Sequence, residues 1–127
     1  MEIQLEAREP HTIQSYSDVA VTVNHEVYSR SIIINRDTLI TDWPVTQASD
    51  LHATSLNTLI ALKPEIIILG SHHPDALRRL DLIRQLCEQK IGVECMDIGA
   101  ACRTFNVLLS EERDVVLGLI YPNLTSY

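Results

Sequence analysis

The stretch "EIIILG", residues 65–70, decides the fold class of this 127-residue chain. It runs from Ile66 to Leu69 without a polar residue, which is typical of a strand covered on both faces in a parallel sheet. The next stretch, "PDALRRLDLIRQLCEQK" (74–90), carries apolar residues at helical spacing. Its predicted apolar stripe consists of Ala76, Leu80, Ile83 and Cys87. The sequence therefore predicts a buried strand followed by a long helix.

Two more strands and a second helix follow downstream. Residues 91–97 and 114–121 are predicted strands, and residues 99–110 between them have the apolar spacing of a helix. The order strand, helix, strand, helix, strand predicts crossover connections between parallel strands, and such connections are right-handed.

The N-terminal part of the chain has the pattern of β-structure instead. Residues 12–17, 19–24, 27–35 and 38–43 alternate or carry short apolar runs between turn signals, so they predict an antiparallel meander. Pro44 ends the meander, because proline cannot donate to a strand ladder. A short helix is expected from Ser55, with Thr54 as its N-cap.

Together these elements predict an α/β fold in three layers. We expect a single domain over residues 1–127 with a mixed central sheet, the N-terminal antiparallel β-meander and a C-terminal β-α-β-α-β unit. Residues 122–127 are expected to form a loose tail.

Charge and composition argue against several classes of function. A net charge of −7 disfavours both nucleic acid and anionic membrane surfaces as partners. No apolar run reaches the ~18 residues that a membrane span needs, and residues 1–13 lack the apolar segment of a signal peptide. We therefore expect no membrane insertion and a cytoplasmic protein. The three cysteines (87, 95 and 102) lack zinc-site spacing, so we expect reduced thiols, no metal and no cofactor.

The stretch "MDIGAACRTFNVLLSEER" (96–113) carries a recognisable signature. It resembles a family of small α/β proteins that includes the mitochondrial complex I assembly factor three and the adipogenesis-associated domain protein, with many bacterial members. The matching positions are Met96, Asp97, Ala100, Ala101, Arg103, Thr104, Phe105, Asn106, Leu108, Glu111 and Arg113, together with Trp43 and Gly70 upstream. The similarity covers about residues 12–121.

This resemblance implies a three-layer α/β fold in a bacterial family member. It also implies an assembly-type role without established catalytic activity. Two positions depart from the family pattern: Ser71-His72 follows Gly70 where the family often has Thr-Gly, and Phe105 stands in place of a tyrosine.

The predicted strand ends bring polar residues together. Gly70, Ser71 and His72 follow one strand, and Asp97 ends its predicted neighbour. Because the carboxyl ends of parallel strands meet at one edge of a sheet, these residues are expected to form a cleft, with Arg103 and Asn106 on the adjoining helix. The guanidinium of Arg103 is suited to a carboxylate or phosphate ligand.

A structural interpretation of the same residues stays open. In it, Arg103 pairs with Asp97 or with a nearby glutamate and holds the helix against the sheet. The sequence contains neither a G-x-S-x-G nor an H-E-x-x-H motif, so no catalytic residue is assigned.

The sequence thus supports two hypotheses about function. The first is a non-enzymatic binding or assembly-type protein related to the complex I assembly factors, acting with a protein partner or as a homo-oligomer. The alternative is a small-molecule binder or unrecognised enzyme that holds an anionic ligand in the cleft between Gly70–His73 and Asp97–Arg103.

Overall fold

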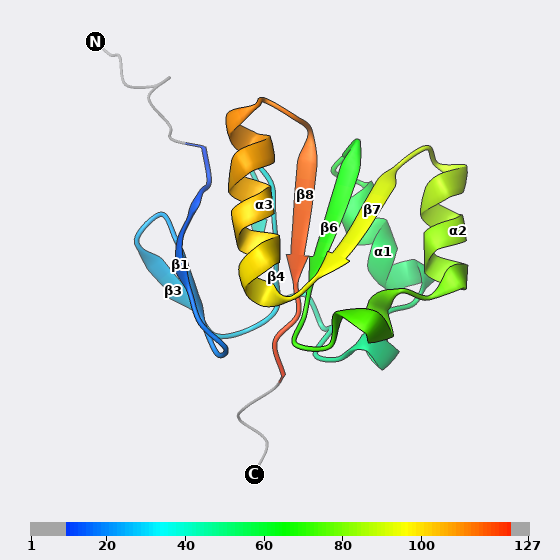
Figure 1. Cartoon of the computed structure of the whole chain (residues 1–127), viewed down its shortest axis with the longest axis horizontal. Coiled ribbons are helices and arrows are strands. Elements are labelled where there is room, and N and C mark those ends of the chain that lie inside the picture. Colours follow the sequence, from blue (N-terminus) through cyan, green and yellow to red (C-terminus); the bar gives the residue numbers. More distant parts are fainter. Residues whose placement is uncertain (1–9, 123–127) are drawn as a thin grey trace.

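The computed structural model describes residues 10–122. The predicted tail, apart from Pro122, lies outside the described residues. A five-stranded sheet with the order β5-β4-β8-β6-β7 forms the middle of the fold, and a three-stranded sheet with the order β1-β2-β3 lies beside it, on the left in Figure 1. The strands are β1 (Ile13–Tyr16), β2 (Val21–Val23), β3 (Glu26–Tyr28), β4 (Ile32–Ile34), β5 (Leu39–Ile40), β6 (Ile66–Gly70), β7 (Gly92–Met96) and β8 (Val115–Leu119).

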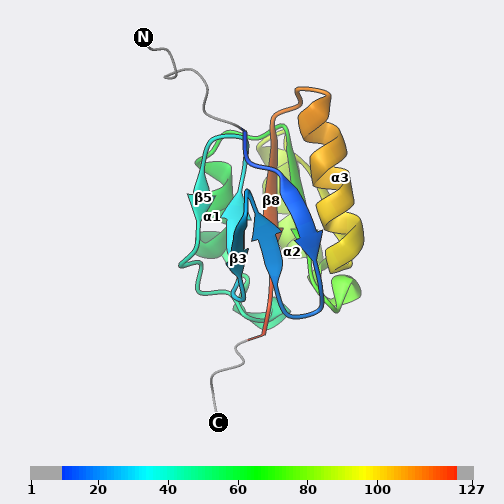
Figure 2. The same cartoon turned by 90° about the vertical axis from the view of Figure 1, so that its left-hand side faces the viewer.

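Helices and the small sheet cover the two faces of the five-stranded sheet. The helices α1 (Ala53–Ile60) and α2 (Leu80–Glu88) pack on one face, and α3 (Ile98–Ser110) packs on the other beside the small sheet (Figures 1 and 2). Each face has its own apolar core, with Phe105 and Ile68 in one and Ile67 and Leu86 in the other. The predicted three-layer α/β fold is therefore confirmed.

Strand β6 is the centre of the parallel part of the sheet. It pairs in parallel with β7 on one side and β8 on the other, so that Ile68 lies opposite both Glu94 and Leu117. Its residues from Ile67 to Gly70 are buried, as the apolar run predicts. The helix α2 connects β6 to β7, and α3 returns the chain to β8 on the opposite face.

The N-terminal meander is confirmed as the sheet β1-β2-β3, but residues 27–35 do not form one strand. The chain leaves the small sheet after Tyr28 and enters the central sheet at Ile32. The physical reason is burial. Ile32–Ile34 are buried without alternation and need cover on both faces, whereas Val27 is 66% exposed at the edge of the small sheet.

The helix predicted over residues 74–90 is also divided. Residues 74–77 form a short 3₁₀ turn, and α2 starts only at Leu80. Arg78 and Arg79 lie between the two pieces, where their side chains donate to the backbone carbonyls of Cys95 (2.7 Å) and Ala48 (3.1 Å). This break rotates the helix, so the predicted stripe was wrong: Leu80 is exposed, and the core side of this segment consists of Leu77, Leu82 and Leu86.

The predicted start of α1 was two residues late. The helix begins at Ala53, and His52 rather than Thr54 is the N-cap. The Ser55 hydroxyl accepts a hydrogen bond from the His52 backbone N–H (3.3 Å), so the serine closes the first turn instead of opening it.

Candidate functional site

Asp97 caps the helix that carries the family-like signature. Its carboxylate accepts a hydrogen bond from the backbone N–H of Ala100 (2.8 Å), at the first turn of α3. A carboxylate at this position satisfies one of the free N–H groups of the helix and complements the positive end of its dipole. The sequence placed Asp97 at a strand end but did not identify this capping role.

Asn106 joins α3 to the small sheet. Its amide oxygen accepts from the backbone N–H of Ile13 (3.0 Å), and its amide nitrogen donates to the Ile13 carbonyl (2.8 Å). The side chain therefore replaces a neighbouring strand along the outer edge of β1. Only an asparagine or glutamine side chain offers both a donor and an acceptor in this planar arrangement.

Arg103 contacts the same strand one turn earlier on the helix. Its guanidinium donates to the Tyr16 hydroxyl (2.5 Å) and lies 5.9 Å from the centroid of the Tyr16 ring. Arg103 thus faces a tyrosine rather than Asp97 or the glutamates that the structural interpretation of the sequence considered. Asp97, Arg103 and Asn106 each have a partner within the chain.

Gly70 and Ser71 lie at the buried end of β6. A Cβ atom at Gly70 would lie 2.7 Å from the Ala101 side chain and 2.7 Å from that of Leu119, so glycine allows α3 to approach the sheet. The Ser71 hydroxyl accepts from the backbone N–H of His73 (3.0 Å) and is largely buried.

His72 connects this strand end to the small sheet. Its Nε2 atom lies 2.7 Å from the Asp18 carbonyl, and its ring meets the Tyr121 ring edge-on at 6.3 Å between centroids. The side chain is exposed and spans the gap between the loop after β6 and the turn that joins β1 to β2.

A cavity of about 590 Å³ lies at the carboxyl ends of β6 and β8. Ser71, His72 and His73 line it together with Ala76 and the segment Thr46–Ser49. Its lining does not include Asp97, Arg103 or Asn106. The structure therefore gives the residues of the predicted cleft different surroundings: Ser71 and His72 line this cavity, Asp97 caps α3, and Arg103 and Asn106 contact β1.

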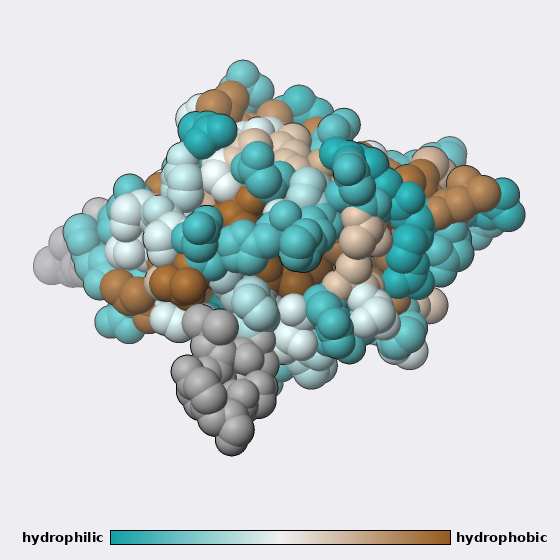
Figure 3. All heavy atoms as spheres, turned by 60° about the horizontal axis from the view of Figure 1, so that its bottom comes forward, coloured by the Kyte–Doolittle hydropathy of each residue, from teal (hydrophilic) through white to brown (hydrophobic). Residues whose placement is uncertain are grey.

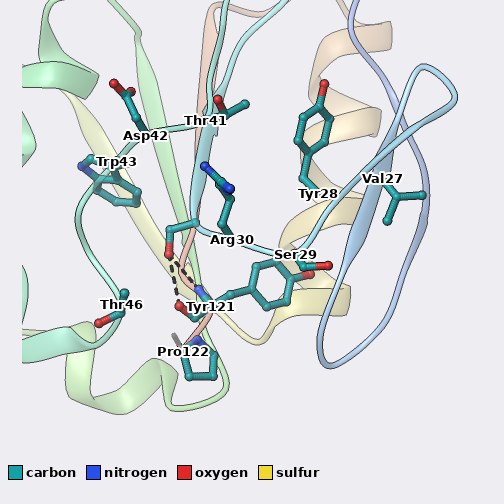
Figure 4. Close-up of a pocket in the computed structure, with 11 residues that line it drawn as sticks. Val27, Tyr28, Ser29, Arg30, Thr41, Asp42, Trp43, Thr46, Tyr121 and Pro122 are labelled. Atoms are coloured by element: carbon teal, nitrogen blue, oxygen red, sulfur yellow. Dashed lines mark hydrogen bonds between the residues drawn. The ribbon is translucent and has the colours of Figure 1, made fainter. Parts of the chain in front are cut away.

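A second cavity, of about 640 Å³, lies beside the first and was not predicted from the sequence. One wall is Val27–Ser31 and the other is Thr41–Trp43, and both cavities share Thr46 and Pro122. Arg30 lies between Tyr28 on one side and Asp42 and Trp43 on the other (Figure 4). At this end of the molecule hydrophilic side chains surround separate hydrophobic patches (Figure 3). Trp43, a position that matches the family-like pattern, and Pro44, which ends the predicted meander, were sequence signals near this cavity.

Ser31 fixes the floor of the second cavity. Its hydroxyl donates to the Val45 carbonyl and accepts from the Tyr121 backbone N–H (2.9 Å), so it joins three segments. Trp43 packs against Gly118 of β8, and its indole N–H is buried without a hydrogen-bond acceptor among residues 10–122. Hydrogen bonds of Ser31 and the packing of Trp43 thus connect the walls of the cavity to β8 and to the segment that follows it.

Two of the three cysteines, Cys95 and Cys102, are buried. Burial raises the pKa of the Cys102 thiol to about 12, so it is protonated and inert at neutral pH. Burial also raises the pKa of Cys95. Within residues 10–122 no three His, Cys, Asp or Glu side chains are grouped to hold a metal ion, and no helix there is long and apolar enough to cross a bilayer.

Comparison with known proteins places the chain in one family. Residues 13–120 match the family described as "Protein of unknown function (DUF498/DUF598)". The chain is 32% identical to NADH dehydrogenase (ubiquinone) 1 alpha subcomplex assembly factor 3 of Xenopus tropicalis, over 88% of this chain and 62% of that protein. The same factor of Danio rerio is 31% identical, over 94% and 70%. The chain thus spans about two thirds of the length of these relatives.

Two bacterial proteins are also similar. The "13 kDa major membrane protein" of Francisella tularensis is 30% identical over 56% of this chain and 58% of its own length. A crystal structure of a Bordetella parapertussis protein has 32% identity and a TM-score of 0.82, over 92% of this chain and 99% of that one.

Proposed function

The chain belongs to the DUF498/DUF598 family, and from this membership we propose that it is a non-enzymatic assembly-type protein that binds a protein partner. The relatives named as assembly factors at about 30% identity support the proposal. The proposal includes the cytoplasmic location that we expect from the sequence.

One observation supports this function above the others. The polar residues of the family-like signature are engaged in holding the fold together: Asp97 caps α3, and Asn106 and Arg103 tie β1 to it. Residues that are bound in this way have a structural role and are not arranged as a free acid, base or nucleophile. An anionic ligand in the predicted cleft receives less support, because Ser71 and His72 line a cavity that excludes Asp97 and Arg103.

The proposal is tested by deleting the gene and separating the respiratory complexes on native gels. We expect the amount of assembled NADH dehydrogenase to fall while its subunits are still synthesised, as immunoblots of denatured extracts would show. Re-expression of the full chain should restore the complex. An unchanged amount of the assembled complex in the deletion strain would refute the proposal.

A further inference from the structure

The cavity between Val27–Ser31 and Thr41–Trp43 is bordered by two edge strands. Strand β3 is the open edge of the small sheet, and Thr41–Trp43 directly follows β5, the edge of the central sheet. We call this cavity the edge groove. We propose that the edge groove binds an extended segment of a partner protein, which adds as a strand to β3 and places an acidic side chain against Arg30. This inference rests on the proposed function in taking the partner to be a protein.

The first argument is that side chains contact the sheet edges at β1 and β7, whereas the open edge of β3 has no such contact among residues 10–122. The Asn106 amide covers the backbone of Ile13 in β1, and Arg78 donates to the Cys95 carbonyl in β7. Side-chain contacts of this kind block an edge against pairing with another chain. Within residues 10–122, the backbone of Glu26–Tyr28 has no hydrogen bonds beyond its ladder with β2.

The direction of the free backbone groups follows from the hairpin register. Val23 and Glu26 flank a two-residue turn, in which Asn24 and His25 both have positive φ. The residues that flank such a turn form a hydrogen-bonded pair, and such pairs alternate along the ladder. The N–H and C=O of Val27 therefore point away from β2, to the open edge. Its side chain is exposed.

The second argument is charge complementarity. Arg30 is exposed and lines the groove between Tyr28 and Asp42 (Figure 4). The ion pairs within residues 10–122 join Arg78 to Asp75, Arg79 to Asp81 and Arg113 to Glu65, and Arg30 is not a member of any of them. An arginine fork binds carboxylates with two parallel hydrogen bonds. Strand addition supplies affinity through the backbone, and one such side-chain pair supplies specificity.

The test starts from a phage-displayed library of random linear peptides about eight residues long, selected on the full chain. The enriched peptides should contain an Asp or Glu. A synthetic copy should shift the amide NMR signals of Val27–Arg30 and of Thr41 and Asp42. Titration calorimetry then gives its affinity for each variant. Failure to enrich any peptide, or shifts confined to other surfaces, would overturn the proposal.

Two pairs of variants make the test specific. Val27→Pro removes only the outward N–H and keeps the ladder to β2, because proline is tolerated where an edge N–H faces solvent. We expect peptide binding at least about fivefold weaker, while Val27→Thr, which keeps the N–H, binds nearly normally. Arg30→Glu should weaken binding at least about tenfold, and Arg84→Glu on the distant α2 should not. Circular dichroism confirms that each variant is folded.

The remaining outcomes separate this inference from the proposed function. If Arg30→Glu abolishes binding but Val27→Pro does not, the groove is an anion site and strand addition is wrong. A concentration-dependent dimer lost in Val27→Pro would assign the groove to a second copy and overturn the proposal. If the Val27→Pro chain fully restores NADH dehydrogenase in the deletion strain, the proposed function stands and the edge-groove inference fails.

Discussion

Asn106→Ala is the sharpest test of what the family-like signature does. The variant removes both hydrogen bonds to Ile13, of 3.0 and 2.8 Å, across 93 positions of the chain. Each hydrogen bond contributes about 1 kcal/mol net to the free energy of unfolding, and leaving the partly buried Ile13 backbone groups without partners adds to the cost. We therefore expect the substitution to lower the free energy of unfolding by about 2–4 kcal/mol. For a domain of this size that lowers the melting temperature by roughly 10 °C.

The assay is urea denaturation followed by far-ultraviolet circular dichroism, with Val107→Ala as the matched control. Val107 is the next residue on the helix and is exposed, so its truncation should change the free energy of unfolding by less than about 0.5 kcal/mol. Hydrogen exchange gives a local measurement, because the Ile13 amide should lose its protection in Asn106→Ala. Equal denaturation midpoints for the two variants, with Ile13 still protected, would refute the structural role of Asn106.

Three further predictions concern packing, thiol reactivity and pH. Gly70→Ala should lower the free energy of unfolding by about 1–3 kcal/mol in urea denaturation, because the new methyl would lie 2.7 Å from Ala101; an unchanged midpoint would contradict this. At about pH 8 a thiol-specific chromogenic reagent should label the exposed Cys87 and spare Cys102, whose pKa burial raises to about 12; equally fast labelling of both would disprove it. Hydrogen bonding from an arginine lowers the pKa of Glu65 below its ordinary value of 4.5, so its stabilising effect is present above that pH and is lost as pH falls through the folded pKa. Glu65→Gln should therefore flatten the fall in melting temperature between about pH 5 and pH 3, and an identical profile for both proteins would count against it.

The parts of the fold that could be predicted are those where one local pattern determines the element. The apolar run at Ile66–Leu69, closed by Gly70, is typical of a doubly covered strand, and β6 is such a strand between β7 and β8. The strand-helix alternation after it likewise determines the crossovers, because few topologies are compatible with it.

The parts that could not be predicted depend on distant partners. Nothing local at Ser29–Ser31 shows that the chain changes sheets there, since the reason is the cover that Ile32–Ile34 find in the central sheet. Similarly, the helix over residues 74–90 breaks where Arg78 and Arg79 reach carbonyls of Cys95 and Ala48, 17 and 31 positions away. Helical spacing within the segment contains no information about these contacts.

In the candidate site, too, the sequence could indicate the residues but not their distant partners. The sequence identified Asp97, Arg103 and Asn106 as a group that packing alone does not explain, and the structure gives each of them a partner. The sequence alone could not identify Tyr16 as the partner of Arg103 or Ile13 as the partner of Asn106. These two residues lie about 90 positions away, on a strand whose register depends on a bulge. The edge groove escaped prediction because its walls come from two different sheets.

Trp43 is the only tryptophan of the chain, and it is 5% exposed where it lines the edge groove. Its packing against Gly118 gives the protein a built-in optical reporter. In the native state its fluorescence should be emitted at short wavelength, as is usual for an indole that water does not reach, and unfolding should shift the emission to the red. Because no other indole contributes, a change in this emission on mixing with a partner would report events beside the groove without any label.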